Sequence, residues 1–153
     1  MDHARTPALR ILVVEDEVLI ALELEYLLDD LGHRVVGIAG NAADAVALGR
    51  STEPDVALVD IHLVDGPTGI EVARALSGDP RITVLFMTAN AKRIPDDFAG
   101  ALGVIAKPYS ERSVASTLAY VARHRAGGPQ PAAPDGFCLA PRGLAPRDRP
   151  ALG

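Results

Sequence analysis

The stretch LRILVVEDE, residues 9–17, sets a short apolar run directly before three acidic residues. A buried parallel strand has this pattern where it runs into a polar loop at its carboxyl end. Four more apolar runs follow, at residues 35–39, 55–61, 82–87 and 104–106. Together they predict five strands, and residues 9–14 form the first.

Amphipathic segments separate these runs and predict helices. The first has apolar residues at helical spacing on one face: Ile20, Leu24, Leu27, Leu28 and Leu31. Capping residues stand before later segments: Asn41, Thr68 with Glu71 at capping-box spacing, and Ser110. Pro95 cannot donate a backbone hydrogen bond, so residues 90–100 are predicted to form only a short or broken helix.

Apolar strands that alternate with amphipathic helices imply a parallel sheet covered on both faces. Because crossovers between parallel strands are right-handed, the predicted fold is α/β with a doubly wound sheet. Such sheets bind ligands at the carboxyl ends of their strands, beside the switch point in strand order. A functional site is therefore expected at that edge.

The composition divides the chain into one domain and two flanking segments. Residues 9–125 carry the strand and helix pattern, and residues 1–8 form an N-terminal extension. Residues 126–153 are rich in Pro, Gly and Ala without periodic apolar positions, so they are predicted to be a disordered tail. The 153 residues are 48% hydrophobic, which is enough for the core of one domain.

Charge and cysteine content exclude several functions. The net charge is −5 and no basic run is present, so direct nucleic-acid binding is not expected. The single cysteine, Cys138, leaves no internal disulfide and no cysteine-based metal site. Neither a signal-peptide core nor an apolar stretch of about 20 residues is found, so we expect a cytoplasmic chain without a membrane partner.

Five residues with useful chemistry stand at the predicted strand ends: Glu15, Asp16, Asp60, Thr88 and Lys107. One parallel sheet would bring them to the same edge. Converging carboxylates repel one another, and a hard cation such as Mg²⁺ relieves that repulsion. Lys107 and Thr88 would offer a positive charge and a hydroxyl donor to phosphoryl oxygens. The set predicts metal-assisted phosphoryl transfer to Asp60.

Each of these residues alone has an ordinary structural explanation. Glu15 and Asp16 would also serve as a helix cap, and Asp60 as a solvated strand end. Thr88 would fit a sheet-edge hydroxyl. These explanations account poorly for all five residues in this order, and Lys107 is one of only two lysines in the chain.

In these motifs the sequence resembles the receiver domain of two-component response regulators over roughly residues 9–125. It looks like a stand-alone, CheY-like receiver, with similarity to single-domain receivers of alphaproteobacterial stress signalling. The motifs that carry the resemblance are Val13-Val14-Glu15-Asp16-Glu17, Val59-Asp60-Ile61, Asp65-Gly66 through Gly69, Met87-Thr88-Ala89 and Lys107-Pro108-Tyr109. The resemblance implies a flavodoxin-like, five-stranded parallel sheet of order 2-1-3-4-5.

The resemblance also implies roles for the site residues. Asp60 would be the phosphoacceptor, and Thr88 and Lys107 would bind phosphoryl oxygens. Mg²⁺ (or Mn²⁺) would have these ligands: Glu15, Asp16, Asp60 and the backbone carbonyl of His62. The donor would be a phosphohistidine on a sensor histidine kinase or a histidine phosphotransfer protein. The chain would be a signalling switch that catalyses only its own phosphorylation and dephosphorylation.

The sequence departs from the family pattern in two places, and two further residues occupy positions that the family uses for tuning. Val104 stands where the family usually has an aromatic residue that moves inward with the threonine, so any rearrangement is expected to involve Tyr109 or the broken fourth helix. The loop 63–68 is longer and richer in Gly and Pro than is common. His62 and Asn90 occupy positions that tune acyl-phosphate hydrolysis in the family, and we expect them to set its lifetime here.

Output is expected through protein–protein contact with an unknown effector, because residues after 125 are too few for an output domain. The predicted contact face surrounds Ile94, Phe98, Val104 and Tyr109, although ordinary core packing explains these side chains equally well. A phosphorelay intermediate or phosphate sink is the alternative function. A phosphorylation-independent adaptor ranks lower, and a fragment of a hybrid kinase stays open.

Two other protein classes fit less well. A phosphatase with an aspartyl nucleophile usually has a second acid two residues later, where this chain has His62. A nucleotide- or flavin-binding domain needs a Gly-rich or Ser/Thr-rich loop after the first strand to hold phosphate. This chain has three acidic residues there.

Overall fold

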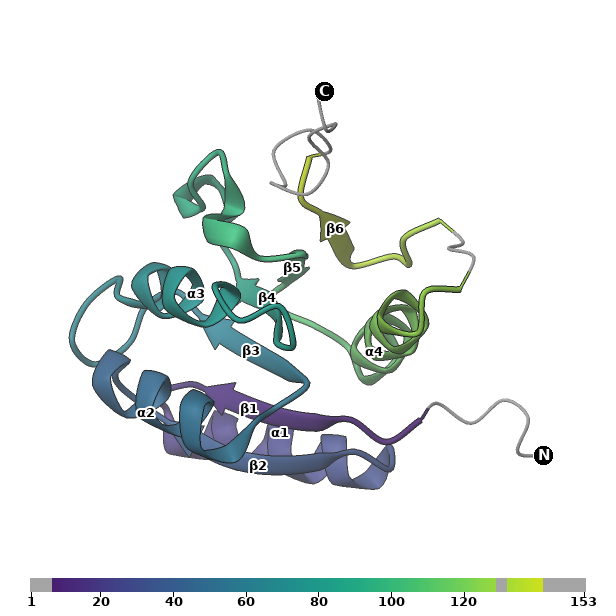
Figure 1. Ribbon diagram of the computed structural model, residues 1–153, viewed down its shortest axis with the longest axis horizontal. Coiled ribbons are helices and arrows are strands. Elements are labelled where there is room, and N and C mark those ends of the chain that lie inside the picture. The colour runs from purple at the N-terminus through teal and green to yellow at the C-terminus, as the bar shows by residue number, and fades with distance from the viewer. Residues whose placement is uncertain (1–6, 129–131, 142–153) are drawn as a thin grey trace.

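The structure, a computed structural model, describes residues 7–128 and 132–141. Its parallel strands are β1 (Arg10–Val14), β2 (Arg34–Ala39), β3 (Val56–Asp60), β4 (Thr83–Thr88) and β5 (Gly103–Ala106). A sixth strand, β6 (Phe137–Leu139), runs antiparallel beside β5, so the order is β2-β1-β3-β4-β5-β6 (Figure 1). The α/β fold and the order of the five parallel strands are as predicted.

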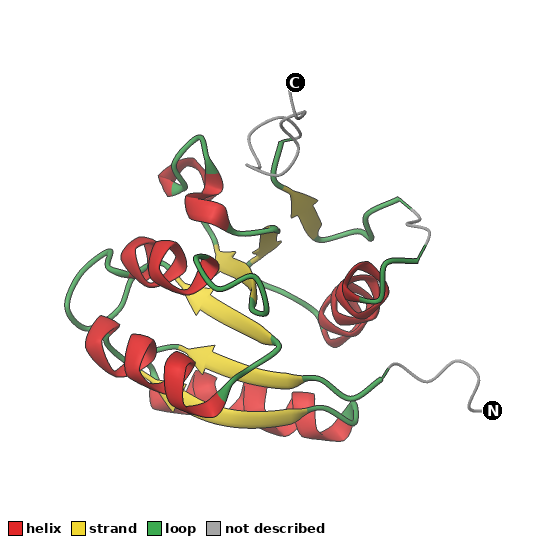
Figure 2. Cartoon of the chain, in the orientation of Figure 1, coloured by secondary structure: helices red, strands yellow, loops and turns green. Residues whose placement is uncertain are grey.

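Helices cover both faces of the sheet (Figure 2). They are α1 (Val18–Asp30), α2 (Ala42–Thr52), α3 (Gly69–Ser77) and α4 (Glu111–Arg125). Side chains of β1 alternate between the faces, as they do in any strand: Ile11 and Val13 pack in the core under α1 and α4, and Leu12 and Val14 in the core under α2 and α3. Burial of both apolar faces drives the sandwich to form.

The caps at Asn41 and Ser110 form as predicted. The Asn41 side chain accepts a hydrogen bond from the Asp44 backbone N–H at 2.8 Å, and Ser110 forms a capping box with Ser113. Residues 90–100 contain only two short 3₁₀ turns, η2 (Ala91–Arg93) and η3 (Phe98–Gly100). This is the broken helix that Pro95 predicted.

The predicted capping box at Thr68 and Glu71 is wrong. Thr68 has helical backbone angles, φ −79° and ψ −4°, and its side chain makes no capping hydrogen bond. Its hydroxyl instead donates to Asp65 Oδ1 at 2.5 Å. Asp65 Oδ2 in turn accepts from the Ala42 N–H at 3.3 Å, so this carboxylate ties the loop before α3 to the start of α2.

The described part of the predicted disordered tail is ordered. Residues 132–141 include β6, and Phe137 is 4% exposed with its ring centroid 5.8 Å from that of Tyr120 on α4. The open edge of β5 supplies backbone partners for this segment, which composition alone does not reveal. Residues 1–6, 129–131 and 142–153, which include most of the predicted N-terminal extension, lie outside the described residues.

Arg125, the last residue of α4, fastens that helix to the amino-terminal ends of β3 and β4. Its Nη1 donates to the carbonyls of Asp55 (2.9 Å) and Arg81 (2.8 Å) and to the Thr83 hydroxyl (3.1 Å). Its Nη2 donates to Asp55 Oδ1 at 3.1 Å. Near this end of the sheet, buried His33 accepts a hydrogen bond from the Leu9 N–H through Nδ1 at 3.1 Å.

Within residues 7–128 and 132–141, no helix is both long and apolar enough to cross a membrane.

Candidate functional site

An acidic cluster lies at the carboxyl ends of β1 and β3. These strands are paired, Val14 with Val59, so Glu15 and Asp16 beyond β1 come beside Asp60 at the end of β3. Carboxylate oxygens from Glu15, Asp16 and Asp60 lie within 4.8 Å of one another. The three acids predicted to converge at this edge therefore do so.

Glu15 is the most buried member of the cluster, with a fully buried side chain. The Glu17 N–H donates to its Oε2 at 3.2 Å. Burial raises the pKa of Glu15, and the neighbouring Asp60 carboxylate adds to that effect, whereas the Glu17 N–H and Lys107 oppose it. A cation at this position would stabilise the ionised form.

Lys107 bridges two of the acids from the end of β5. Its Nζ lies 3.3 Å from Asp60 Oδ2 and 3.4 Å from Glu15 Oε1. Burial alone would lower the pKa of Lys107, but the Asp60 and Glu15 carboxylates outweigh burial and raise it. The ammonium is therefore charged at neutral pH and is held beside the Asp60 carboxylate.

Thr88 ends β4 one residue beyond Met87, which pairs with Asp60. Its side chain is buried, and its hydroxyl oxygen accepts from the Asn90 N–H at 3.0 Å. Its backbone carbonyl accepts from the Lys107 N–H at 2.9 Å, which fixes the end of β5 against β4. The Thr88 hydroxyl hydrogen is left to donate to another oxygen.

Gly69 brings the first turn of α3 directly behind Asp60. Its N–H donates to the Ile61 carbonyl at 2.9 Å, and a Cβ built on it would lie 2.0 Å from the Asp60 carbonyl oxygen. Only glycine fits such an approach between two backbone segments. Sequence reasoning quoted Gly69 within a motif but missed this role. A glycine that opens a helix nine residues after Asp60 was the available signal.

The donor set of this edge suits a hard divalent cation. It consists of carboxylate oxygens, without sulfur or imidazole nitrogen in the cluster. Mg²⁺ prefers oxygen ligands and binds through one or two carboxylates plus phosphate oxygens and water. Glu15, Asp16 and Asp60 therefore fit Mg²⁺.

The sequence model of the family described as the response regulator receiver domain matches residues 11–119 of this chain. This chain belongs to that family. Receiver domains are signalling switches in two-component systems, and in this chain the Asp60 carboxylate lies beside Lys107 and within a cluster of acids that could hold a metal ion.

Known receivers are similar to this chain over most of its length. The phyllosphere-induced regulator PhyR of Methylorubrum extorquens is 35% identical over 113 residues, which are 72% of this chain and 42% of that protein. The PhyR receiver domain of Erythrobacter litoralis superposes with a TM-score of 0.69 at 30% identity, covering 83% of this chain and 97% of that one. The chain spans about half the length, or less, of the first curated relatives it matches.

A second similar structure contains a metal. The receiver domain of a Pseudomonas aeruginosa sensor histidine kinase has a TM-score of 0.64 at 26% identity, covers 73% of this chain and 95% of that one, and has a magnesium ion coordinated in its active-site cleft.

The remaining predicted receiver residues differ in placement. His62 and Asn90 are exposed, and the Asn90 side chain accepts from the Lys92 N–H at 3.2 Å. Ile94 and Val104 are 8% and 5% exposed and belong to the core, while Phe98 and Tyr109 are partly buried against it. The alternative of core packing therefore describes Ile94 and Val104 better than a free contact face does.

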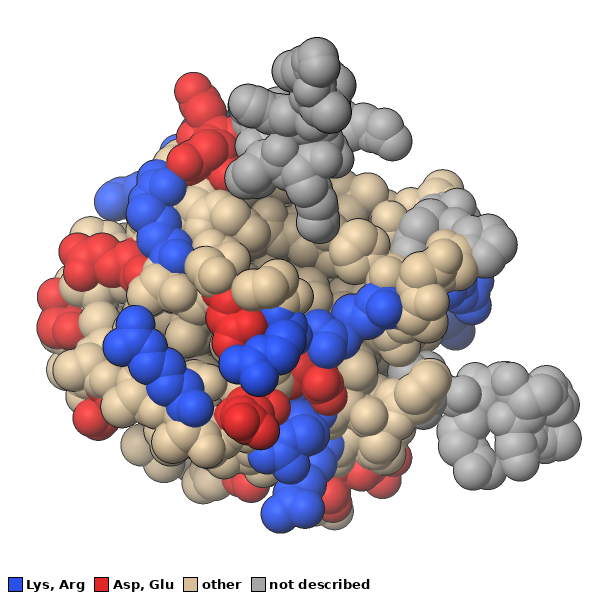
Figure 3. All heavy atoms as spheres, in the orientation of Figure 1, with Lys and Arg blue, Asp and Glu red and all other residues tan. Residues whose placement is uncertain are grey.

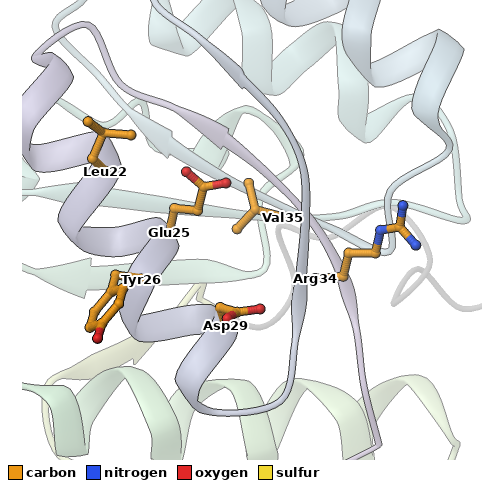
Figure 4. Close-up of a pocket in the computed structure, with 6 residues that line it drawn as sticks. All are labelled: Leu22, Glu25, Tyr26, Asp29, Arg34 and Val35. Atoms are coloured by element: carbon orange, nitrogen blue, oxygen red, sulfur yellow. The ribbon is translucent and has the colours of Figure 1, made fainter.

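The outer edge of this receiver has a separate groove between α1 and β2. It has a volume of about 520 Å³ and is lined by Leu22, Glu25, Tyr26, Asp29, Arg34 and Val35 (Figure 4). None of these residues belongs to the acidic cluster. On the face drawn in Figure 3, Lys and Arg side chains are interspersed with Asp and Glu.

Proposed function

We propose that Asp60 accepts a phosphoryl group from a phosphohistidine on a sensor histidine kinase or a phosphotransfer protein, with the help of Mg²⁺ (or Mn²⁺). The modified protein then signals by contact with an effector protein. The observation that carries the proposal is the position of Lys107 Nζ, 3.3 Å from Asp60 Oδ2 and 3.4 Å from Glu15 Oε1, beside three carboxylates within 4.8 Å of one another.

The reaction follows from this arrangement. A carboxylate oxygen of Asp60 attacks phosphorus, the bond between phosphorus and the imidazole nitrogen of the donor breaks, and its electron pair stays on that nitrogen. Lys107 and the Thr88 hydroxyl hold phosphoryl oxygens as negative charge shifts onto them. Bound Mg²⁺, held by Glu15, Asp16 and Asp60, supplies charge neutralisation. The backbone carbonyl of His62 stays a predicted further ligand.

Exposed apolar residues beside the site support docking of a protein donor. Val18 and Leu19 follow the acidic loop directly and are 69% and 76% exposed, and Leu22 continues the surface one turn later. Val64, in the loop after Asp60, is 72% exposed. Exposed apolar residues grouped in this way mark protein-interaction surfaces. A donor protein that docks on this part of α1 would bring its histidine near Asp60, because α1 begins two residues after Asp16.

The direct test is phosphorylation by a small donor, acetyl phosphate, followed by intact mass. Wild type with Mg²⁺ is expected to gain one phosphoryl group as acetate leaves. Asp60→Ala is expected to gain none, and EDTA is expected to suppress the adduct in wild type. The matched control is Asp96→Ala, which removes an exposed acid outside the cluster and should react as wild type does.

Two results would end the proposal. An adduct on Asp60→Ala would place the acceptor elsewhere. A wild-type chain that stays unmodified and also fails to bind beryllofluoride in the presence of Mg²⁺ would point to a phosphorylation-independent adaptor. His62 and Asn90 are tested afterwards by timing phosphate loss from variants at each position.

A further inference from the structure

Strand β6 covers the outer edge of β5, the strand that Lys107 follows. It pairs with β5 through Leu139 opposite Gly103, Cys138 opposite Val104 and Phe137 opposite Ile105. Lys107 follows the last residue of β5. The segment that pairs with β6 therefore also carries the ammonium that contacts Asp60.

The pairing extends to the residue next to Lys107. The Ala106 N–H donates to the Gly136 carbonyl at 3.1 Å, and the Lys107 N–H donates to the Thr88 carbonyl at 2.9 Å. Consecutive backbone amides of β5 are thus held from opposite sides, one by β6 and the next by β4. Removal of β6 would leave the end of β5 supported on one side only.

The surface that receives β6 is shaped for this segment. A Cβ at Gly103 would lie 2.4 Å from the Cys138 carbonyl oxygen and 2.7 Å from the Phe137 ring, so a glycine is needed for β6 to dock. Phe137 is buried against Tyr120 of α4. The Ala140 N–H donates to the Leu102 carbonyl at 2.8 Å and closes the other end. Leu139, in contrast, is 39% exposed.

Phosphorylation of Asp60 changes what Lys107 must contact. The acyl phosphate lacks the carboxylate charge that Nζ now meets at 3.3 Å and adds phosphoryl oxygens farther out along the side chain. To bind them, Nζ has to leave its bridge between Asp60 and Glu15. Lys107 directly follows Ala106, whose pair with Gly136 is the outermost contact with β6, so a change in the position of Lys107 would bear on that contact.

We propose that β6 is an intramolecular cover of the β5 edge and that its docking opposes phosphorylation of Asp60. Docked β6 holds Lys107 in the carboxylate bridge, and phosphorylation weakens the docking of β6. By linkage, release of β6 must favour phosphorylation to the same extent. The inference rests on the proposed function, and it adds a regulatory segment, residues 132–141, to it.

The first test follows amide hydrogen exchange in the intact chain with Mg²⁺, with and without beryllofluoride, which mimics the phosphoryl group on the aspartate. The amides of Ala106 and Ala140 are expected to exchange about fivefold faster or more with beryllofluoride. The amides of β1, in the middle of the sheet, serve as the internal control and should not change. Unchanged exchange at Ala106 and Ala140, with beryllofluoride bound, would overturn the inference and leave the proposed function standing.

The reciprocal test compares the affinity for beryllofluoride, in the presence of Mg²⁺, in Phe137→Ala and Leu139→Ala. Phe137→Ala removes the buried anchor and is expected to bind beryllofluoride about fivefold more tightly, whereas Leu139→Ala removes an exposed side chain of the same strand and should match wild type. Gly103→Ala blocks docking by another route and should act as Phe137→Ala does. Equal affinities in all four proteins would overturn the inference, and absence of both beryllofluoride binding and an acetyl phosphate adduct in all four would overturn the proposed function itself.

Discussion

Gly69→Ala should damage both the stability and the phosphorylation of this receiver. The added Cβ would lie 2.0 Å from the Asp60 carbonyl oxygen and 2.7 Å from the Ile61 Cα, and both are backbone atoms that cannot rotate away. Ordinary contact begins near 3.4 Å, so α3 and the acceptor segment must separate by about 1.4 Å. Overpacking against backbone should cost about 3 kcal/mol in the free energy of unfolding.

Gly78→Ala, at the C-cap of the same helix, is the matched control. Gly78 has φ −68° and ψ −17°, and its Cβ would make only an ordinary 3.4 Å contact with the Ala75 carbonyl. This change should be neutral or stabilise the fold by up to about 1 kcal/mol, because alanine restricts the unfolded chain.

Urea unfolding gives the free energies of the three proteins, and intact mass after acetyl phosphate gives their phosphorylation rates. Gly69→Ala should also react more slowly under conditions where it is fully folded, since the displaced segment carries Asp60. A Gly69→Ala protein within about 0.5 kcal/mol of wild type and equally reactive would refute the idea that α3 positions the acceptor.

Three further changes have expected outcomes. Lys107→Met should lower the melting temperature, because it leaves the buried Glu15 carboxylate without its ion-pair partner. Mg²⁺ should then raise the melting temperature of this variant more than it raises that of wild type. Lys92→Met, at the only other lysine, should change neither the melting temperature nor the effect of Mg²⁺. Burial lowers the pKa of His33, so as the pH falls the unfolded chain binds the proton before the folded chain does. The stability present above pH about 6.5 should therefore fall with decreasing pH, by at most about 1.4 kcal/mol per pH unit. Urea unfolding from pH 7.5 to 5.5 should show a smaller fall in stability for His33→Asn than for wild type. Thr117→Val should raise the unfolding free energy by about 1 kcal/mol, because the buried Thr117 hydroxyl has no hydrogen-bond partner among the described residues.

The site could be predicted because it depends on few structural facts. Once five parallel strands were placed, their carboxyl ends had to share one edge. Glu15 and Lys107 directly follow strand ends and Asp60 is the last residue of β3, so an error of one residue in a strand boundary would not separate them. The ion-pair distances confirm that they meet.

The features that were missed depend on contacts distant in sequence. Phe137, Cys138 and Leu139 form a three-residue apolar run inside a Pro- and Gly-rich segment, and they become a strand because β5 offers an open edge and Gly103 leaves room. Thr68 has the spacing of a capping residue, but Asp65 lies close enough to accept a hydrogen bond from its hydroxyl. Local pattern rules do not include such competing partners.

The fastening of α4 at Arg125 gives the molecule a mechanical asymmetry. The guanidinium binds two carbonyls, a hydroxyl and a carboxylate at the end of the sheet opposite the acidic cluster. These contacts hold the carboxyl-terminal end of α4 against the sheet. The near end is capped by Ser110, three residues after Lys107. A displacement of the end of β5 would therefore be expected to move the Ser110 end of this 15-residue helix more than the Arg125 end.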